Sequence, residues 1–421
     1  MNNIVDRIQT FNQERDPQLI QLKYRAMRTE VFAFYRGTCH LFYEDWHARS
    51  SLDEVPPVWI CGDLHWQNFG SYKGDNRLVY FDINDFDEAV LAPCTWDLAR
   101  FLVSLWVSTR ILNMNKSKAS TLCTYFLDVY TRTLGKGYVR SVEEDKTAGL
   151  VRELLFQVKV RSRKDLLDGR TEQTGTVRKL RIDGKHAIPV TEAERVEITN
   201  LMEYWGAKQT NPRFYTVLDI AHRVAGIGSL GIERYILLVE GKGSPNRNYL
   251  LGLKAESSSS LQPYLTLPQP RWINEAERAV TIQRWFQNVP PALLTAVQMG
   301  SKSYVLRELQ PQEDKVNVEF LGGKLRRLER LVKTTAQVIA WGQLRSCGRQ
   351  GSAPSYDLMN FSQKFPGRNA LLKYAQEYAA QVEEDYRAFC SAYDSGAFSS
   401  DEGGAPYTSA TTLRSGRSTK R

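Results

Sequence analysis

Carboxylate and amide side chains crowd one short stretch near the start of the chain. Asp63 lies in a Gly-Asp-Leu-His motif, and Asn68 follows shortly after it. An apolar run then leads into an acidic cluster made of Asp82, Asp85, Asp87 and Glu88. Carboxylates repel one another and are costly to bury, so this cluster indicates a cation nearby. Because Mg²⁺ prefers hard oxygen ligands, the stretch predicts a magnesium site.

The spacing within this stretch is typical of one kind of chemistry. Phosphoryl-transfer enzymes place an Asp and an Asn a few residues apart, followed by a strand and by further Asp residues. In that arrangement Asp63 accepts the proton of the acceptor hydroxyl, and Asn68 with a later Asp holds the metal. Pairing of the intervening strands fixes the distance between the two groups. The stretch therefore predicts phosphoryl transfer to a hydroxyl.

A second informative stretch is rich in glycine. Gly226, Gly228 and Gly231 form a G-x-G-x-x-G pattern that contains Ser229, and two strand patterns follow, the second of which ends at Lys254. A dinucleotide-binding unit would continue into a helix, so the pattern indicates a β-hairpin that covers a nucleotide. Glycines let the backbone approach phosphates closely, and a lysine supplies positive charge for them. A lone strand-end lysine is usually a surface residue, but its place behind this hairpin favours phosphate binding.

Composition limits the class of partner. The chain has 421 residues, enough for two lobes, and its 42% hydrophobic and 24% charged residues are ordinary for a globular protein. The formal net charge of +9 favours anionic partners such as nucleotides. No cysteine pair has C-x-x-C spacing, so reduced core thiols are expected. Neither an apolar signal region nor a run of membrane-spanning length is present, so we expect a cytoplasmic protein with no membrane partner.

The rest of the chain is mainly helical, with strands in its middle. Apolar periodicity predicts helices over 17–48, 97–112, 116–138, 143–158, 272–287, 323–346 and 369–393. Further strands are expected over 293–299 and 303–309. Within helix 272–287, Glu277 or Glu275 could pair with Lys254. The basic segment 159–185 has turn signals and few aromatic residues, which favours a solvated hairpin over a nucleic-acid site. The Ser- and Gly-rich tail 395–421 is predicted to be disordered.

Two resemblances follow from these motifs. The segments 61–68, 81–87 and 96–100 together resemble the catalytic region of aminoglycoside and choline phosphotransferases, which belong to the protein-kinase-like superfamily. Over nearly its full length the chain also resembles a bacterial family filed as domain of unknown function 2252, grouped with the kinase-like fold. The segments that carry this second resemblance are 32–37, the central stretch, 224–231, 253–254, 283–284, 304–309 and 378–386.

The resemblance implies roles for individual residues. Asp63 corresponds to the catalytic base, and Asn68 corresponds to a catalytic-loop metal ligand. Asp85 is the metal-binding Asp that best suits the distance to Asp97, while Asp82 is nearer the usual distance from Asp63 and remains an alternative. The cofactor-binding set is Gly226, Gly228, Ser229, Gly231, Lys254 and, as the partner of the lysine, Glu277. The implied cofactors are ATP and Mg²⁺. One departure from the family pattern is Gln343, which stands where a His is usual.

The resemblance also implies a fold, in an unusual order. Kinases place the glycine loop before the catalytic loop, whereas here the catalytic loop comes first. A circularly permuted, two-lobed α+β kinase-like fold explains this order, because permutation is tolerated where termini lie at the surface. The expected divisions are 1–140 for the first part of a helical C-lobe, 141–212 for a basic insert and connector, 213–312 for a small antiparallel β N-lobe, 313–394 for the closing C-lobe helices, and 395–421 for the tail.

The expected function is ATP- and Mg²⁺-dependent phosphoryl transfer to a hydroxyl of a small molecule or protein. Two alternatives keep the same nucleotide site: a pseudokinase-like regulator that does not transfer, and a nucleotidyltransferase that binds the nucleotide the other way round. A nucleic-acid-binding protein that uses segment 159–185 is less favoured. It would leave the acidic cluster unexplained, because carboxylates repel a phosphate backbone unless metal is bound.

Overall fold

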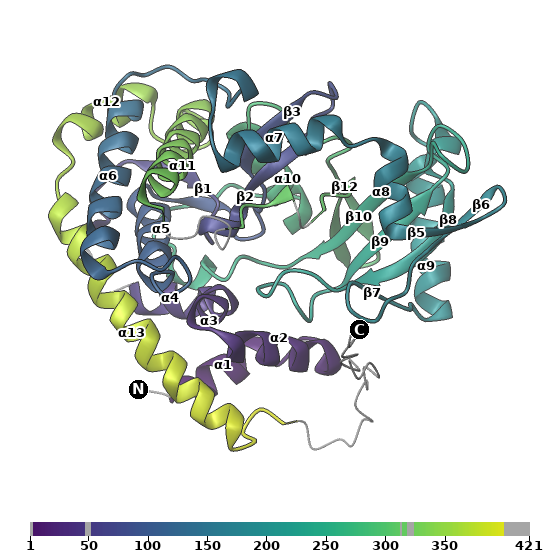
Figure 1. Ribbon diagram of the computed structural model, residues 1–421, viewed down its shortest axis with the longest axis horizontal. Coiled ribbons are helices and arrows are strands. Elements are labelled where there is room, and N and C mark those ends of the chain that lie inside the picture. Colours follow the sequence, from purple (N-terminus) through teal and green to yellow (C-terminus); the bar gives the residue numbers. More distant parts are fainter. Residues whose placement is uncertain (1–2, 47–51, 312–313, 318–323, 400–421) are drawn as a thin grey trace, which may run out of the picture.

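A computed structural model describes residues 3–46, 52–311, 314–317 and 324–399 of the chain. Figure 1 shows helices gathered on one side of the molecule and an antiparallel sheet on the other. We call these the helical region and the sheet region. The prediction of an α+β protein with small antiparallel sheets is confirmed. In the described part of the chain, no helix is both long and apolar enough to cross a membrane.

The sheet region is built on six antiparallel strands in the order β11-β12-β10-β9-β8-β7. Their bounds are β7 Ala187–Ile188, β8 Val217–Arg223, β9 Arg234–Val239, β10 Tyr249–Glu256, β11 Thr295–Met299 and β12 Lys302–Glu308. Aliphatic and aromatic residues dominate β9 and β10, which suits a pleated surface covered on both faces. In this register Lys254 lies opposite Arg234 on one neighbouring strand and opposite Val305 on the other.

Helices cover the sheet from both faces and at one end. Helix α9 (Glu192–Gly206) packs Ile198 and Met202 onto one face, and Leu167 of α8 (Arg163–Arg170) packs on the other. Helix α10 (Glu275–Phe286) packs against β11 and β12. Strand β7 and helix α9 precede residue 213, and they pair with or pack on the strands of this sheet.

The basic segment combines a helix with a hairpin rather than forming a simple hairpin. After α8, β5 (Thr171–Thr174) pairs with β6 (Val177–Leu180). Arg178 is buried and donates to Asp168 and to the backbone carbonyl of Pro245. Arg163 pairs with Glu308 on the sheet. Several of the basic side chains therefore serve packing between local elements.

The helical region holds the larger core. Its central element is α5 (Thr95–Val107), in which every residue is buried. Around it lie α6 Lys116–Leu134, α7 Leu150–Val160, α11 Leu325–Ser346, α12 Ser355–Lys364 and α13 Arg368–Asp394. Helix α12 lies between the helices expected over 323–346 and 369–393, where the apolar periodicity predicts no helix. The apolar faces of these helices share one core cluster, so the region is a single packed unit.

The N-terminal helices continue this core. They are α1 Ile4–Asn12, α2 Pro17–Thr29, α3 Val31–Gly37 and α4 Cys39–Trp46. The single helix expected over 17–48 is broken at Glu30, whose backbone is extended, and again at Thr38. The breaks let α3 turn its aromatic face inward. Residues 47–51 and the tail residues 400–421 lie outside the described residues, so the predicted disorder of the tail falls almost wholly outside them.

Two short antiparallel ribbons carry the acidic stretch between the two regions. Strand β1 (Pro57–Ile60) pairs with β4 (Val90–Pro93), and β2 (Phe69–Lys73) pairs with β3 (Val79–Ile83). The Asp63 motif leaves the end of β1, and the acidic cluster joins the end of β3 to the start of β4. Strand pairing therefore brings the two motifs together, as the spacing predicted.

Candidate functional site

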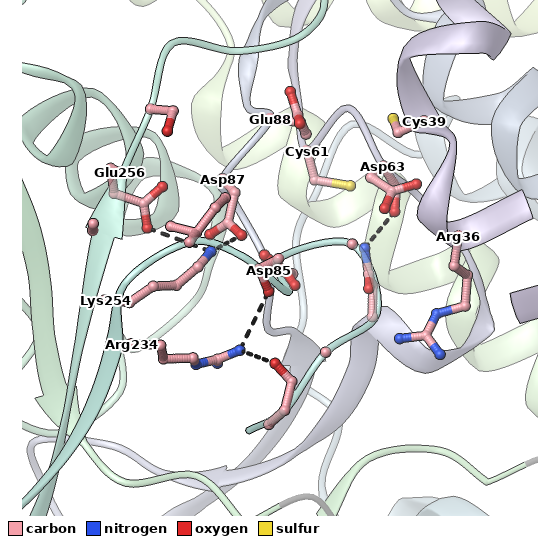
Figure 2. A pocket seen from close by; sticks show the side chains of 18 of the residues that line it. Arg36, Cys39, Cys61, Asp63, Asp85, Asp87, Glu88, Arg234, Lys254 and Glu256 are labelled. Carbon is pink, nitrogen blue, oxygen red and sulfur yellow. Dashed lines mark hydrogen bonds and ion pairs between the residues drawn. The ribbon is translucent and has the colours of Figure 1, made fainter. Parts of the chain in front are cut away.

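A cavity of about 1320 Å³ lies between the helical and sheet regions. Asp63 and Asn68 line it from one motif, Asp85 lines it from the acidic cluster, and Lys254 lines it from β10. The glycine loop, residues 226–231, adds Gly226, Gly228, Ser229 and Gly231. Figure 2 shows the labelled side chains of these segments converging on one space. Residues far apart in sequence thus share a single site.

A buried carboxylate holds the backbone of the loop that bears Asp63. Asp97, at the start of α5, accepts hydrogen bonds from the backbone N–H groups of Cys61 and Gly62 at 2.9 and 3.0 Å. Burial raises the pKa of Asp97 to about 7, and these two N–H groups oppose that rise. Gly62 has a φ of +82°, and a Cβ there would lie 2.5 Å from the carbonyl oxygen of Glu88, so only glycine fits.

The Asp63 carboxylate is held by a buried arginine. Arg100 donates from Nε and Nη2 to Asp63 Oδ1, at 3.0 and 2.8 Å, and also donates to the carbonyl of Tyr35. Its guanidinium lies 3.6 Å from the centre of the Tyr35 ring. Because Oδ1 is occupied twice, Oδ2 is the oxygen left for other partners. The arrangement leaves Oδ2 of Asp63 available to a molecule in the cavity.

His65 lies beside that second oxygen. Its Nε2 is 3.7 Å from Asp63 Oδ2 and 3.3 Å from Nε of Arg36, while Nδ1 accepts from the N–H of Gln67 at 3.1 Å. Burial lowers the pKa of His65 well below its ordinary value, and the charges of Arg36 and Arg100 lower it further. His65 is therefore a neutral spacer between Asp63 and Arg36.

Asn68 and Asp85 supply oxygen ligands suited to Mg²⁺. Asn68 donates from Nδ2 to the carbonyl oxygen of Asp63, which leaves its Oδ1 as an acceptor. Burial by itself raises the pKa of Asp85, but Lys254, Lys315 and Arg234 outweigh it and hold the pKa at about 2. No group of three or more His, Cys, Asp or Glu side chains in the described residues is arranged to hold a metal.

Asp82, the alternative metal ligand of the sequence analysis, lies outside the cavity lining. It is buried in β3, its Oδ1 accepts from the N–H of Ile83, and Arg345 is its nearest cation at 3.7 Å. Burial raises its pKa to about 6, although Arg345 opposes the rise. Asp82 is not among the cavity-lining residues, because it belongs to the strand, whereas Asp85 follows the end of β3. The structure thus brings Asp85, and not Asp82, into the cavity.

Lys254 has partners other than the one expected. Its ammonium pairs with Asp87 and lies 3.7 Å from Glu256. Glu277 instead accepts from the backbone N–H of Ile273 at 2.8 Å, and Glu275 pairs with Arg278 at 2.6 Å. The prediction that Glu277 or Glu275 pairs with Lys254 is therefore wrong. Both carboxylates are drawn into contacts at the start of their own helix.

Arg278 locks the acidic cluster to the sheet region. This buried side chain donates to the backbone carbonyls of Asp87 and Ala89 at 2.8 and 2.6 Å, and to that of Ser257 at 3.1 Å. Glu88, in the same loop, accepts from the Ser260 N–H at 2.6 Å. These contacts hold the segment after Asp85 against the segment after Lys254.

The glycine loop is positioned by the N-terminal helices. Gly226 and Gly231 have φ values of +82° and +88°. Arg15 donates from Nη1 to the carbonyls of Gly228 and Leu230, at 2.7 and 2.9 Å. A Cβ at Gly231 would lie 2.8 Å from Cβ of Arg15, so the close approach requires glycine. The loop therefore depends on a segment about two hundred residues earlier in the chain.

Several site residues had no strong sequence signal. Arg100 was noted only as part of a motif, and Arg15, Arg36, Arg234 and Lys315 were not predicted as cavity residues. Arg15 and Arg234 donate to backbone carbonyls and Arg36 contacts His65, and no local spacing in the sequence records such contacts. Gln343, the departure from the family pattern, is buried outside the cavity and accepts from the Tyr130 hydroxyl.

Comparison with known proteins identifies a family but no characterised relative. Neither the curated proteins nor the solved structures contain a match to this chain. The likeness to kinase-like enzymes therefore rests on the motifs in the chain itself. A family model described as "Uncharacterized protein conserved in bacteria (DUF2252)" matches residues 15–392. That match covers most of the sequence, and the chain belongs to this family.

Proposed function

We propose that this protein is an ATP- and Mg²⁺-dependent phosphotransferase that acts on a hydroxyl group. One observation carries the proposal: Asp63, Asn68, Asp85, Lys254 and the glycine loop line the same cavity. A carboxylate base, oxygen ligands for Mg²⁺, a lysine and a loop of backbone N–H groups are the parts that phosphoryl transfer uses.

The nucleotide half of the proposed site lies on the sheet side. Lys254 is 8% exposed, and Asp87 holds its ammonium at the cavity wall, where it can meet a phosphate. The glycine loop can bring backbone N–H groups close to the same phosphates. Asn68 and Asp85 would hold Mg²⁺, which neutralises phosphate charge. The ionised state of Asp85 suits that task.

The acceptor half lies around Asp63. Arg100 holds Oδ1, so Oδ2 would take the proton of the acceptor hydroxyl. The acceptor oxygen then bonds to the γ-phosphorus as the bond between that phosphorus and the bridging oxygen of ADP breaks. The proton passes to Asp63, and ADP carries away the electron pair of the broken bond. Positioning and charge stabilisation supply most of the rate in such a reaction.

The same proposal includes a permuted kinase-like architecture. The sheet region is inserted between two segments that form one helical core, with the cavity between them. This supports a sheet lobe that covers the nucleotide and a helical lobe that carries the base, joined in a different order from ordinary kinases.

The test is transfer from γ-labelled ATP, with Mg²⁺, to a panel of hydroxyl acceptors. Asp63→Ala should lower transfer by about 10²–10⁴-fold, because the group that receives the proton is lost. Its affinity for a non-hydrolysable ATP analogue should stay within about threefold, because Lys254 and the glycine loop remain. Asp82→Asn is the matched control, since it alters a nearby buried Asp outside the cavity and should retain transfer.

Three outcomes would redirect the proposal. Equal transfer by Asp63→Ala and the wild type would remove Asp63 as the base. Products that carry an adenylyl group, identified by mass, would assign the chain to nucleotidyl transfer. Binding of Mg·ATP with no transfer to any acceptor would favour the regulator instead.

A further inference from the structure

Arg36 lies in the cavity, where burial lowers its pKa and the charges of Asp63, Asp85 and Glu30 partly oppose this. It is in the last turn of α3, half-buried, with its Nε 3.3 Å from Nε2 of neutral His65. Its guanidinium also lies 5.9 Å from the centre of the Phe32 ring. Among the described residues, no carboxylate forms an ion pair with it. Withdrawing a guanidinium from water without a counter-charge is costly, so its position favours a ligand that supplies the charge.

Lys315 is a second cation that lines the cavity close to Arg36. Its backbone bridges to Gly70, and the next residue, Val316, donates to the carbonyl of Phe69, so the lysine is anchored beside the Asn68 motif. Within the described ranges its ammonium has no ion pair. Burial lowers the pKa of Lys315 to about 7, and although Asp85 opposes this, Arg36 lowers it further. Within the described ranges, neither cation of this corner is paired with a carboxylate, although the charge of Asp85 acts on both.

The other cations of the cavity already have partners. They are Lys254 with Asp87, Lys302 with Glu233, Arg15 with the carbonyls of Gly228 and Leu230, Arg234 with the carbonyl of Ala225, and Arg223 with the carbonyl of Gln310. Of the cavity cations in the described residues, Arg36 and Lys315 are therefore the two whose side chains have neither a carboxylate nor a backbone carbonyl as a partner.

The position of Arg36 separates it from the proposed nucleotide site. Figure 2 shows Lys254 and Arg234 on one side of Asp85, and Arg36 on the side of Asp63. His65 contacts both Arg36 and Asp63, at 3.3 and 3.7 Å. A group bound to Arg36 would thus lie one side chain away from the proposed base, within the reach of a small acceptor molecule.

On the basis of the proposed function, we propose that the hydroxyl acceptor carries a phosphate or carboxylate group, which Arg36 and Lys315 bind beside Asp63. Arginine suits such a group because its planar fork matches two oxygens of a carboxylate or phosphate. The same charges repel a polycationic acceptor such as an amino sugar.

The test uses inorganic sulfate as the probe of this anion site. Protein saturated with Mg²⁺ and a non-hydrolysable ATP analogue is titrated with sulfate by calorimetry. The wild type should bind sulfate without releasing the nucleotide. Arg36→Gln should weaken sulfate binding at least tenfold, and Lys315→Gln should weaken it severalfold. Arg36→Lys keeps the charge and should retain part of the affinity, which separates loss of charge from loss of folding.

Lys302→Gln is the matched control. It removes a cation from the cavity rim that is exposed and already paired with Glu233, so sulfate affinity should not change. A second arm compares phosphoryl transfer to neutral sugars, their phosphate esters, hydroxy acids and amino sugars. Turnover of the anionic members should be at least tenfold more efficient, and Arg36→Gln should raise their KM while KM for ATP stays within twofold.

Defined results would overturn the inference. Sulfate that displaces the nucleotide analogue, or Arg36→Gln that weakens the analogue as much as sulfate, would assign these cations to the nucleotide phosphates. Absence of sulfate binding, or turnover of only neutral or amino acceptors, would also overturn it. Failure of the proposed function looks different: the nucleotide analogue does not bind, while Arg36-dependent sulfate binding persists in the protein alone.

Discussion

The proposed catalytic-loop region, residues 61–68, and the glycine-loop region, residues 226–231, face the same cavity but are held in different ways. The first is fixed by the buried side chains of Asp97 and Arg100 on α5, whose every residue is buried. The second is held through its backbone carbonyls by Arg15, which lies between two N-terminal helices.

The two kinds of contact should contribute differently to stability and to ligand binding. Removing one partner of a buried ion pair strongly destabilises the folded state. We therefore expect the proposed catalytic loop to be held as firmly as the helical core. Hydrogen bonds from one arginine to two backbone carbonyls contribute less to the free energy of unfolding, so we expect the glycine loop to be the more easily displaced of the two. We expect loss of the α5 side chains that hold the first region to damage the fold, and loss of the side chain that holds the second to damage nucleotide binding.

The largest expected effect comes from Arg100→Met. It leaves the Asp63 carboxylate without its guanidinium and removes a donor to the Tyr35 carbonyl. The free energy of unfolding should fall by about 3–5 kcal/mol in urea titrations, as expected when one partner of a buried pair is lost. The control is Arg368→Met, whose partially exposed pair with Asp128 should contribute no more than about 1 kcal/mol. Equal losses for the two variants would contradict the rigidity assigned to the catalytic-loop region.

An intermediate effect, dependent on pH, is expected from Asp82→Asn. Because burial raises the folded-state pKa of Asp82 from 3.8 to about 6, its contribution to stability is present below pH 4 and is lost as the pH rises through 6. The wild type should therefore lose up to about 3 kcal/mol relative to the Asn variant between pH 4 and pH 8. Urea unfolding of both proteins across this range measures the difference. If the difference in free energy of unfolding between the two proteins did not vary with pH, the pKa of Asp82 would not be raised by burial.

The smallest expected change in stability comes from Arg15→Gln. Loss of two hydrogen bonds to carbonyls should lower the free energy of unfolding by about 1–2 kcal/mol. Affinity for a non-hydrolysable Mg·ATP analogue should fall about threefold to tenfold, because the glycine loop is no longer held over the cavity. Arg28→Gln, which breaks a surface pair with Asp394, serves as the control and should change neither quantity appreciably. If Arg15→Gln left nucleotide affinity intact, the glycine loop would not depend on the N-terminal helices.

The same contrast explains what could be predicted from the sequence. Asp63, Asn68 and Lys254 were found because motif spacing and strand patterns are local, and the structure brings them into one cavity. Which of Asp82 and Asp85 lines the cavity depends on where β3 ends, and the apolar pattern does not locate that end to within a residue.

Other features could not be read from local patterns. The expected partner of Lys254 was wrong because Asp87 and Glu256 lie closer once the acidic cluster folds onto β10. Arg15 and Arg36 were missed as cavity residues because their contacts, to the carbonyls of the glycine loop and to His65, form only across the fold. Helix α12 was missed because Gly, Ser and Pro around it carry turn signals that its packing against α6 overrides.

The most direct measurement is a crystal structure with Mn²⁺ in place of Mg²⁺ and a non-hydrolysable ATP analogue. The account predicts an anomalous peak bounded by Asn68 and Asp85, with phosphates under the glycine loop and within hydrogen-bond reach of Lys254. A metal beside Asp82, or a nucleotide bound outside this cavity, would contradict it.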